Sequence, residues 1–350
     1  MVEIGVIGGD GIGPEVVRAG MKVLEVAAGE EPSLELGFTE FPWGCEYYLE
    51  HGRMMPEDGL DTLAAFDEIY LGAVGWPTVP DHVSLWGLLL PIRRTFDQYV
   101  NLRPARLLRG VKSPLANPND LDITVVRENT EGEYSDSGGR VYRDTPYEIA
   151  VQESIFTRRG VERIIRYAFE EASARRGLLV GATKSNGISV TMPFFDEIFR
   201  EISSDYPEVE ASLMHADALA ARLVLDPGSF DVVVGSNLFG DLLSEVTAAI
   251  AGAIGIAPSA NLNPEGTHPS LFEPIHGSAP DIAGEGAANP AGAIWAGAMM
   301  LDHAGYPDAG TRVLNALEET LESGTKTRDL GGTATTGEMA DAVVQRLGGT

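Results

Sequence analysis

Short apolar runs alternate with longer amphipathic segments along almost the whole chain of 350 residues. The apolar runs predict buried strands at 3–9, 34–41, 67–73, 123–127, 178–183, 209–215, 231–235 and 270–275. The amphipathic segments predict helices at 14–28, 157–176, 193–204, 217–225, 241–253, 290–304, 308–323 and 336–347. Strands separated by helices are typical of α/β proteins, so we expect a mainly parallel sheet. Gly, Pro and Asn interrupt 255–269 and 276–293, which we expect to be functional loops.

The first predicted strand ends in the turn Gly8-Gly9-Asp10-Gly11-Ile12-Gly13-Pro14. A Rossmann dinucleotide loop needs G-x-G-x-x-G between its strand and its helix, and here the third glycine is misplaced. No Gly-Lys-Ser or Gly-Lys-Thr follows, so the turn is not a P-loop either. The sequence predicts a tight strand-to-helix turn with exposed backbone N–H groups.

Acidic residues outnumber basic ones by 52 to 25, which gives a formal net charge of −27. Such a chain should repel nucleic acid and anionic membranes. No run approaches the roughly 20 apolar residues of a membrane span, and no basic signal-peptide start is present, so we expect a cytoplasmic protein. The single Cys45 excludes an internal disulfide. An acidic surface with few lysines also predicts a host that accumulates salt.

Three arginines, Arg93, Arg103 and Arg127, lie beside apolar runs in IRRTFDQYVNLRP and VVREN. Guanidinium groups grip carboxylates with two parallel hydrogen bonds. The set therefore indicates a small anionic substrate. The alternative interpretation is that each arginine pairs with a local acid.

Two acids, Asp241 and Glu245, lie four residues apart on one face of a predicted helix in SNLFGDLLSE. Like charges at this spacing repel unless a cation joins them, and a hard divalent cation prefers oxygen ligands. Asp217, at another strand–helix junction, is the candidate for a third ligand. The alternative is a solvated acidic face.

A tyrosine and a lysine, Tyr134 in VRENTEGEY and Lys184 in TKSN, are candidates for acid–base work. A lysine near other cations has a lowered pKa, and this chain has only four lysines, so Lys184 is not expected to be surface filler. The loop at 271–290 offers His276, Asp281 and Asn289 to a nucleotide. A carboxylate such as that of Asp281 binds ribose hydroxyls but repels a 2′-phosphate, so it favours NAD over NADP.

Six segments, GDGIGPEV, NLRP, REN-TEG-Y, TKSN, NLFGDLLSE and EPIHGSAPDIAG, occur in one order along nearly the whole chain. Together they resemble the metal-dependent β-decarboxylating dehydrogenases, which include isocitrate, 3-isopropylmalate, homoisocitrate and tartrate/D-malate dehydrogenases. The resemblance is strongest to the tartrate/D-malate branch, and Gly187 offers no contact to an isopropyl group. Leu89 and Leu90 match the 3-isopropylmalate branch instead, so that branch remains the alternative.

The resemblance implies a two-lobed α/β fold with a mainly parallel sheet that is not a Rossmann domain. One discontinuous lobe, 1–100 plus 255–350, would carry most of the NAD site. The central lobe, 101–254, would carry the metal ligands and the interface of a homodimer with shared active sites. Lys184 and Asp217 would then reach the active site from the partner subunit.

The resemblance also implies individual roles in the oxidative decarboxylation of a small 2-hydroxy diacid. Arg93, Arg103 and Arg127 would hold its carboxylates, Lys184 would take the hydroxyl proton, and Tyr134 would protonate the enol carbon. Mg²⁺ or Mn²⁺ would be bound by Asp217, Asp241 and Glu245. Glu245 stands where the family usually has Asp, which leaves its direct coordination of the metal open. A requirement for K⁺ is also left open. NAD would contact Gly11, Ile12, Glu273, His276, Gly277, Ser278, Ala279, Asp281 and Asn289.

Overall fold

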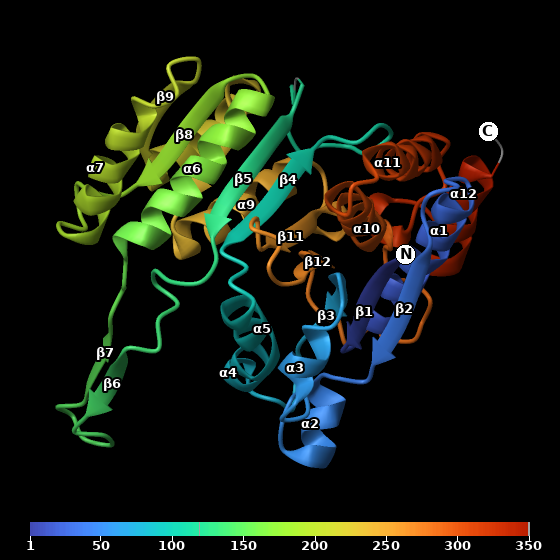
Figure 1. The fold of residues 1–350 in the computed structure, drawn as a ribbon, viewed down its shortest axis with the longest axis horizontal. Coiled ribbons are helices and arrows are strands. Elements are labelled where there is room, and N and C mark those ends of the chain that lie inside the picture. Colours follow the sequence, from blue (N-terminus) through green and yellow to red (C-terminus); the bar gives the residue numbers. More distant parts are fainter. Residues whose placement is uncertain (119, 349–350) are drawn as a thin grey trace.

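A single ten-stranded sheet runs through the molecule in this computed structural model, which describes residues 1–118 and 120–348 (Figure 1). The strand order is β2-β1-β3-β12-β11-β4-β5-β10-β8-β9. The strands are β1 (Val2–Gly9), β2 (Leu36–Phe41), β3 (Glu68–Ala73), β4 (Val100–Arg106), β5 (Asp122–Glu128), β8 (Leu178–Thr183), β9 (Glu210–His215), β10 (Val232–Gly235), β11 (Pro258–Leu262) and β12 (Ser270–Pro274). The expected α/β class is thereby confirmed.

The two ends of the sheet are parallel, and its middle is antiparallel. β2, β1, β3 and β12 pair in parallel, as do β5, β10, β8 and β9. Between them, β11 runs antiparallel to β12 and β4, and β4 runs antiparallel to β5. The central reversal brings strands from distant parts of the chain to one place, where the polar side chains described below converge.

Helices cover the sheet in two groups, which Figure 1 shows at opposite ends of the molecule. α1, α10, α11 and α12 contact one another at one end, and α6–α7 and α8–α9 pair at the other. A π-helical turn at Leu85–Leu89 joins α4 to α5. The helices are α1 (Gly13–Gly29), α2 (Cys45–His51), α3 (Gly59–Leu63), α4 (Asp81–Ser84), α5 (Leu90–Thr95), α6 (Arg158–Ala174), α7 (Thr191–Ser203), α8 (Ala216–Leu225), α9 (Asn237–Ile250), α10 (Ala291–His303), α11 (Pro307–Glu322) and α12 (Thr336–Leu347).

The structure corrects two local predictions. β11 lies inside 255–269, which was expected to be a loop. Its proline, serine and asparagine do not favour a strand, although all five residues are buried. α9 begins at Asn237 rather than 241, since the Ser236 hydroxyl caps it by accepting from the Phe239 N–H. Both corrections place additional polar residues beside the candidate site.

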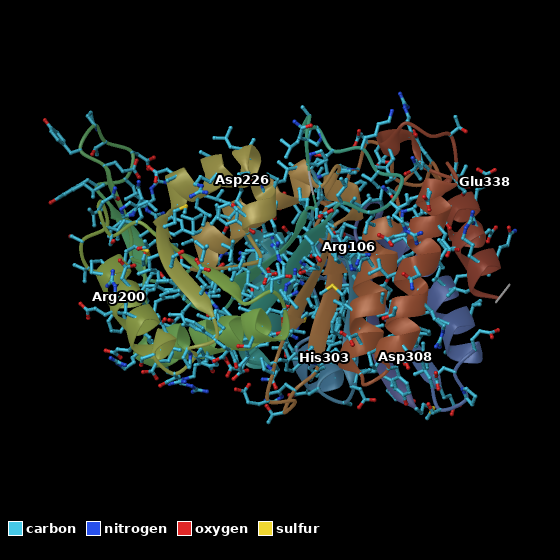
Figure 2. All side chains as sticks on the ribbon, turned by 90° about the horizontal axis from the view of Figure 1, so that it is seen from above. Arg106, Arg200, Asp226, His303, Asp308 and Glu338 are labelled. Carbon is cyan, nitrogen blue, oxygen red and sulfur yellow. The ribbon has the colours of Figure 1, made fainter. Side chains whose placement is uncertain are left out.

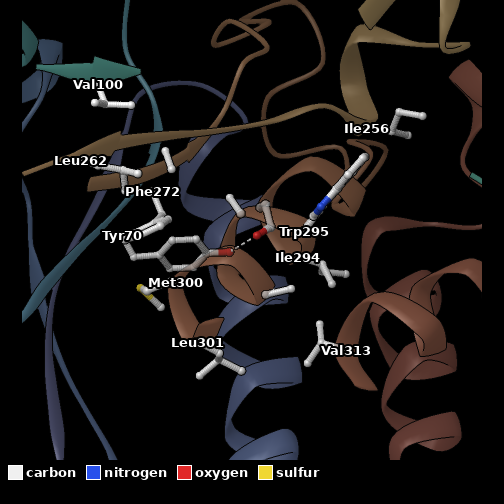
Figure 3. Packing of buried hydrophobic residues seen from close by; sticks show 14 of the residues in the cluster. Tyr70, Val100, Ile256, Leu262, Phe272, Ile294, Trp295, Met300, Leu301 and Val313 are labelled. Atoms are coloured by element: carbon white, nitrogen blue, oxygen red, sulfur yellow. Dashed lines mark hydrogen bonds between the residues drawn. The ribbon is translucent and has the colours of Figure 1, made fainter. Parts of the chain in front are cut away.

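Tyr70 lies in the core that joins β3 and β12 to α1 and α10 (Figure 3). Its hydroxyl donates to the Ala293 carbonyl oxygen over 2.6 Å, so its one polar atom is satisfied although the side chain is fully buried. Phe272 and Trp295 belong to the same cluster. At Gly20 on α1, an added Cβ would lie 2.0 Å from the Tyr70 hydroxyl oxygen, so only glycine lets α1 pack this closely.

A two-stranded arm of β6 (Gly138–Val141) and β7 (Ile149–Gln152) projects from the body of the molecule (Figure 1). Every residue in both strands is exposed. The arm presents apolar side chains to solvent, among them Val141, Tyr142, Tyr147, Ile149 and Val151. An isolated two-stranded hairpin is marginally stable in water, so an arm with this composition calls for a covering surface.

The expected lobes 1–100 plus 255–350 and 101–254 share this one sheet. The strands of the first range lie on one side of the β11–β4 pairing, and those of the second lie on the other. The division into lobes remains a prediction. Among the described residues, no helix has the length and apolar character needed to cross a membrane.

Candidate active site

The predicted arginine set lines one cavity of about 260 Å³. Arg93 comes from α5, Arg103 from β4 and Arg127 from β5, and Tyr134 and Asp241 line the same cavity. With Glu273, His276 and Gly277, which also line this cavity, the structure brings together eight of the predicted site residues from segments spread over about 185 positions. Leu85, Leu89 and Leu90 form an apolar wall beside them.

Each of the three arginines contacts an acid that lies more than a hundred residues away. Arg93 Nη2 donates to Glu273 Oε1 over 2.9 Å, where both side chains are buried. Arg103 Nη1 donates to Asp241 Oδ1 over 3.1 Å and to Ser244 Oγ over 2.8 Å. Arg127 Nη1 forms an ion pair with Asp241. Each arginine therefore pairs with an acid, as the alternative interpretation expected, but the partners are distant in the sequence rather than local.

Two of the arginines keep unused donors, and the residues that line the cavity carry a surplus of positive charge. The Nε atoms of Arg93 and Arg103 are buried without a hydrogen-bond partner. Three guanidinium groups face the cavity, whereas Asp241 and Glu273 are the acids that line it. Buried charged donors without partners are costly, so the site is suited to an anion that would satisfy them.

Tyr134 is placed as a proton donor at this cavity. Its hydroxyl donates to Asp241 Oδ2 over 3.3 Å, and its ring lies 5.5 Å from the Arg127 guanidinium carbon. Burial, with the negative charge of Asp241, raises the pKa of Tyr134 although Arg127 opposes the shift. The phenol therefore keeps its proton through the neutral range.

The predicted metal ligands and the lysine divide into two groups. Glu245 lies one helical turn from Asp241, and its Oε1 is 3.7 Å from Arg103 Nη1. Burial raises the pKa of Glu245, although Arg103 opposes this. Lys184 Nζ instead donates to Asp217 Oδ2 over 2.7 Å, and this bond lowers the pKa of Asp217.

Neither Lys184 nor Asp217 lines the cavity, and the Asp217 side chain is 68% exposed. Across residues 1–118 and 120–348, no three His, Cys, Asp or Glu side chains are close enough to hold a metal ion. One chain therefore places the predicted ligands Asp241 and Glu245 together and the predicted ligand Asp217 elsewhere.

The opening turn lies against the late loop, about 265 residues further along the chain. The Ile12 N–H donates to the Ser278 carbonyl oxygen over 2.8 Å. Gly11 has a φ of +59°, and an added Cβ would lie 1.9 Å from that oxygen, so glycine is required there. Gly277 and Ser278 line a cavity of about 450 Å³, and Gly11 lines one of about 410 Å³.

The residues predicted to contact the nucleotide differ in whether their side chains already have hydrogen-bond partners. The buried Nε2 of His276 has no partner, and burial lowers the pKa of this imidazole. Asn289 Oδ1 accepts from the Ala291 N–H at the start of α10 over 3.0 Å, and Asn289 Nδ2 donates to Asp329 Oδ2 over 2.8 Å. Asp281 is exposed, and Ala279 has a φ of +37°. Asp329 belongs to no motif that the sequence analysis identified. Its contact with Asn289 shows that it lies in this region.

Sequence reasoning also missed a buried set of amides beneath the cavity. Asn261 Oδ1 on β11 accepts from Asn101 Nδ2 on β4 and from Asn129 Nδ2, each over 2.9 Å. Asn261 Nδ2 then donates to Glu273 Oε1 over 2.8 Å, so Glu273 is held by both Asn261 and Arg93. The only signal was that these residues occur near or within the six segments.

Comparison with known proteins gives close relatives along the full chain. A probable tartrate dehydrogenase/decarboxylase of Bacillus subtilis is 55% identical over 99% of this chain and 98% of its own. A D-malate dehydrogenase [decarboxylating] of Escherichia coli is 57% identical over 98% and 97%. The crystal structure of isocitrate dehydrogenase from Methylococcus capsulatus covers 99% of each chain, with a TM-score of 0.90 and 36% identity. The isocitrate/isopropylmalate dehydrogenase family matches residues 3–343, so the chain belongs to this family, as its sequence segments predict.

Proposed function

We propose that the protein catalyses the NAD-dependent and divalent-metal-dependent oxidative decarboxylation of a small 2-hydroxy diacid. D-malate, converted to pyruvate and CO₂, and tartrate are the proposed substrates. The observation that supports this proposal most directly is the cavity lined by three arginines together with Tyr134 and Asp241. The relatives that are 53–57% identical are named as tartrate dehydrogenases/decarboxylases and a D-malate dehydrogenase [decarboxylating], which supports the choice of substrate.

The arginines account for the binding of a dianion. Arg93 and Arg103 have buried Nε donors without partners, and a carboxylate would satisfy such donors. Because three guanidinium groups converge on one small space, they would fix both carboxylates of a diacid and lower the entropic cost of the reaction.

The oxygen ligands fit a hard divalent cation. Asp241 and Glu245 are partly exposed carboxylates one helical turn apart, and family members generally use NAD and a divalent metal ion. We propose Mg²⁺ or Mn²⁺, which would act as a Lewis acid on the carbonyl next to the bond that breaks. Arg103 and Arg127, two of the three proposed substrate arginines, pair with Asp241 and so hold it beside the substrate.

The opening turn and the late loop are the proposed NAD site. Gly11 and Ile12 lie against Ser278, and the unpaired Nε2 of His276 offers a polar atom to the nucleotide. Asp281 favours a ribose without a 2′-phosphate. The cofactor would supply the hydride acceptor.

Proton transfer falls to Tyr134 and Lys184. Tyr134 keeps its proton and faces the cavity, so it can protonate the enol carbon. Lys184 lies outside the cavity of its own chain, so we propose that it acts, with Asp217, in the active site of a second subunit.

Two apolar surfaces support a homodimer. Val190, just before α7, is 77% exposed. Leu225 on α8 is 81% exposed, and Leu242 on α9 is 56% exposed. The β6–β7 arm is the second such surface. A cytoplasmic location without nucleic-acid or membrane partners completes the proposal.

The second candidate is 3-isopropylmalate dehydrogenase, which the wall of Leu85, Leu89 and Leu90 favours because leucines suit a branched alkyl group. NADH formation from D-malate, L-tartrate and 3-isopropylmalate, with NAD and Mn²⁺ at low and high KCl, separates the candidates. We expect turnover of D-malate or tartrate. Turnover of 3-isopropylmalate alone would establish the second candidate, and turnover of none would contradict the proposal.

A further inference from the structure

Asn237, the first residue of α9, is 2% exposed and uses both ends of its amide. Its Oδ1 accepts from Arg127 Nε over 3.1 Å and from Arg127 Nη2 over 2.8 Å. Its Nδ2 donates to the Glu131 carbonyl oxygen over 3.0 Å. The reverse amide orientation would set donors against donors, so this network fixes which end faces the arginine.

Asn237 therefore determines which edge of Arg127 remains available. A guanidinium has five N–H donors in a rigid fork, and Asn237 takes the Nε and one Nη2 donor. Of the three remaining donors, one on Nη1 and one on Nη2 form the Nη1–Nη2 edge, and Nη1 pairs with Asp241 at the cavity. A substrate carboxylate would consequently meet Arg127 at this edge.

The backbone is built to bring Asn237 this close. At Gly240, one turn along α9, an added Cβ would lie 2.5 Å from the Cβ of Arg127. At Gly132, whose φ is +79°, an added Cβ would lie 3.3 Å from the Cβ of Asn237. Both glycines let α9, β5 and the segment that carries Tyr134 approach one another around one amide.

The side chains of asparagine and aspartate have nearly the same shape, but only the carboxylate carries a negative charge. A buried aspartate at 237 would accept the same two hydrogen bonds but would also neutralise Arg127, and its second oxygen would oppose the Glu131 carbonyl. A neutral oxygen satisfies the donors and leaves the positive charge for an anionic ligand.

We propose that Asn237 is a positioning residue: its neutral amide holds one edge of Arg127 without adding a negative charge, so that the other edge, where Nη1 also pairs with Asp241, meets a substrate carboxylate. This inference rests on the proposed function, in which Arg127 binds the diacid.

The test is Asn237→Asp, with Asn263→Asp as its matched control. Asn263 is also 2% exposed, its Oδ1 accepts from the Thr267 N–H, and its Nδ2 donates to the Asp97 carbonyl oxygen. Both substitutions place an acid in a buried amide site, but only the first lies next to a cavity arginine. Their thermal midpoints report the general cost of the change.

We expect Asn237→Asp to raise the KM for D-malate about tenfold or more, while kcat changes less than about threefold and the KM for NAD is unchanged. Asn263→Asp should leave all three values near those of the wild type. A KM for D-malate within about twofold of wild type in Asn237→Asp would overturn the inference.

Calorimetric titration of D-malate into the protein in the presence of Mg²⁺ tests the positioning role separately from the proposed function. If the wild type turns over no diacid, the proposed function is wrong, and the positioning role is then judged from binding alone. About tenfold weaker binding by Asn237→Asp than by Asn263→Asp supports the role, and equal binding contradicts it.

Discussion

Individual residues at the cavity owe their properties to neighbours that are distant in the sequence. Tyr134 lies between the Arg127 guanidinium and the Asp241 carboxylate, which act on its pKa in opposite directions. Burial is the largest contribution, and with Asp241 it raises the pKa of the phenol. The chemistry of this side chain is therefore set by the fold rather than by its local sequence.

Replacement of Tyr134 by Phe removes the proposed acid and keeps the ring. We expect kcat to fall by about 10²–10⁴ because protonation of the enol carbon loses its donor, with little change in the thermal midpoint. Because the pKa of Tyr134 is raised, phenol ionisation should reduce the activity of the wild type only at a higher pH than for an ordinary tyrosine, whose pKa is about 10. Steady-state rates across pH 6–10 test this, and an unchanged kcat in Tyr134→Phe would contradict the role.

The sequence identified the charged residues of the cavity but not the amides behind them. Arg93, Arg103 and Arg127 stand out because guanidinium groups next to apolar runs need an explanation. Asn237 and Asn261 have no such pattern, since an asparagine gains its role only from partners that the fold supplies. Arg127 is 110 positions from Asn237, and Asn101 is 160 positions from Asn261.

Helices and strands were predictable where a local rule decides them. α6 follows such a rule, because the Thr157 hydroxyl caps it by accepting from the Gly160 N–H. β11 follows no local rule, because its polar residues Ser259 and Asn261 are stabilised by contacts with Asn101 across the sheet. Tertiary contacts therefore decided the elements that sequence patterns missed.

Replacement of Thr157 by Ala should lower the free energy of unfolding by about 1 kcal/mol, because the cap of α6 is lost. The Thr157 hydroxyl also donates to Glu131 Oε2 over 2.8 Å, so the loss extends to the segment before Tyr134. Denaturant unfolding measures the change, with Thr157→Ser as the control that keeps the hydroxyl. Equal losses in both variants would show that the methyl group, not the cap, is responsible.

The molecule as a whole divides the proposed catalytic groups between two places. Tyr134 lines the cavity with the arginines, whereas Lys184 pairs with Asp217 outside it. Exposed apolar side chains on the arm and near Leu225 offer surfaces for a second copy. These three features point to an active site completed by two chains.

Mixing two inactive variants tests a shared site. Tyr134→Phe keeps Lys184, and Lys184→Met keeps Tyr134, so a mixed dimer has one site with both groups intact. Unfolding and refolding an equal mixture should restore about a quarter of the wild-type activity, since half the dimers are mixed and each has one intact site of two. Each variant refolded alone is the control, and a mixture no more active than these would contradict sharing.

The net charge of −27 should make stability depend on salt. Screening shortens the range of self-repulsion to about 3 Å at 1 M salt, so the unfolding midpoint should rise between about 0.1 M and about 2 M KCl. Charged side chains cover the outline of the molecule in Figure 2, in keeping with a repulsion spread over the surface. The effect should shrink near the isoelectric point of about 4.5, and equal stability at both salt concentrations would contradict the expectation.

The position of β12 between β3 and β11 has a consequence for synthesis on the ribosome. β3 ends at Ala73 and β12 ends at Pro274, so about 200 residues must be made before β3 gains its second neighbour. At about 5–20 residues per second, this takes roughly 10–40 s. During that time β3 has an unpaired edge, and α1, which packs on β1 and β3, lacks the helices α10–α12 that later contact it. The nascent chain therefore needs protection from aggregation for most of its translation.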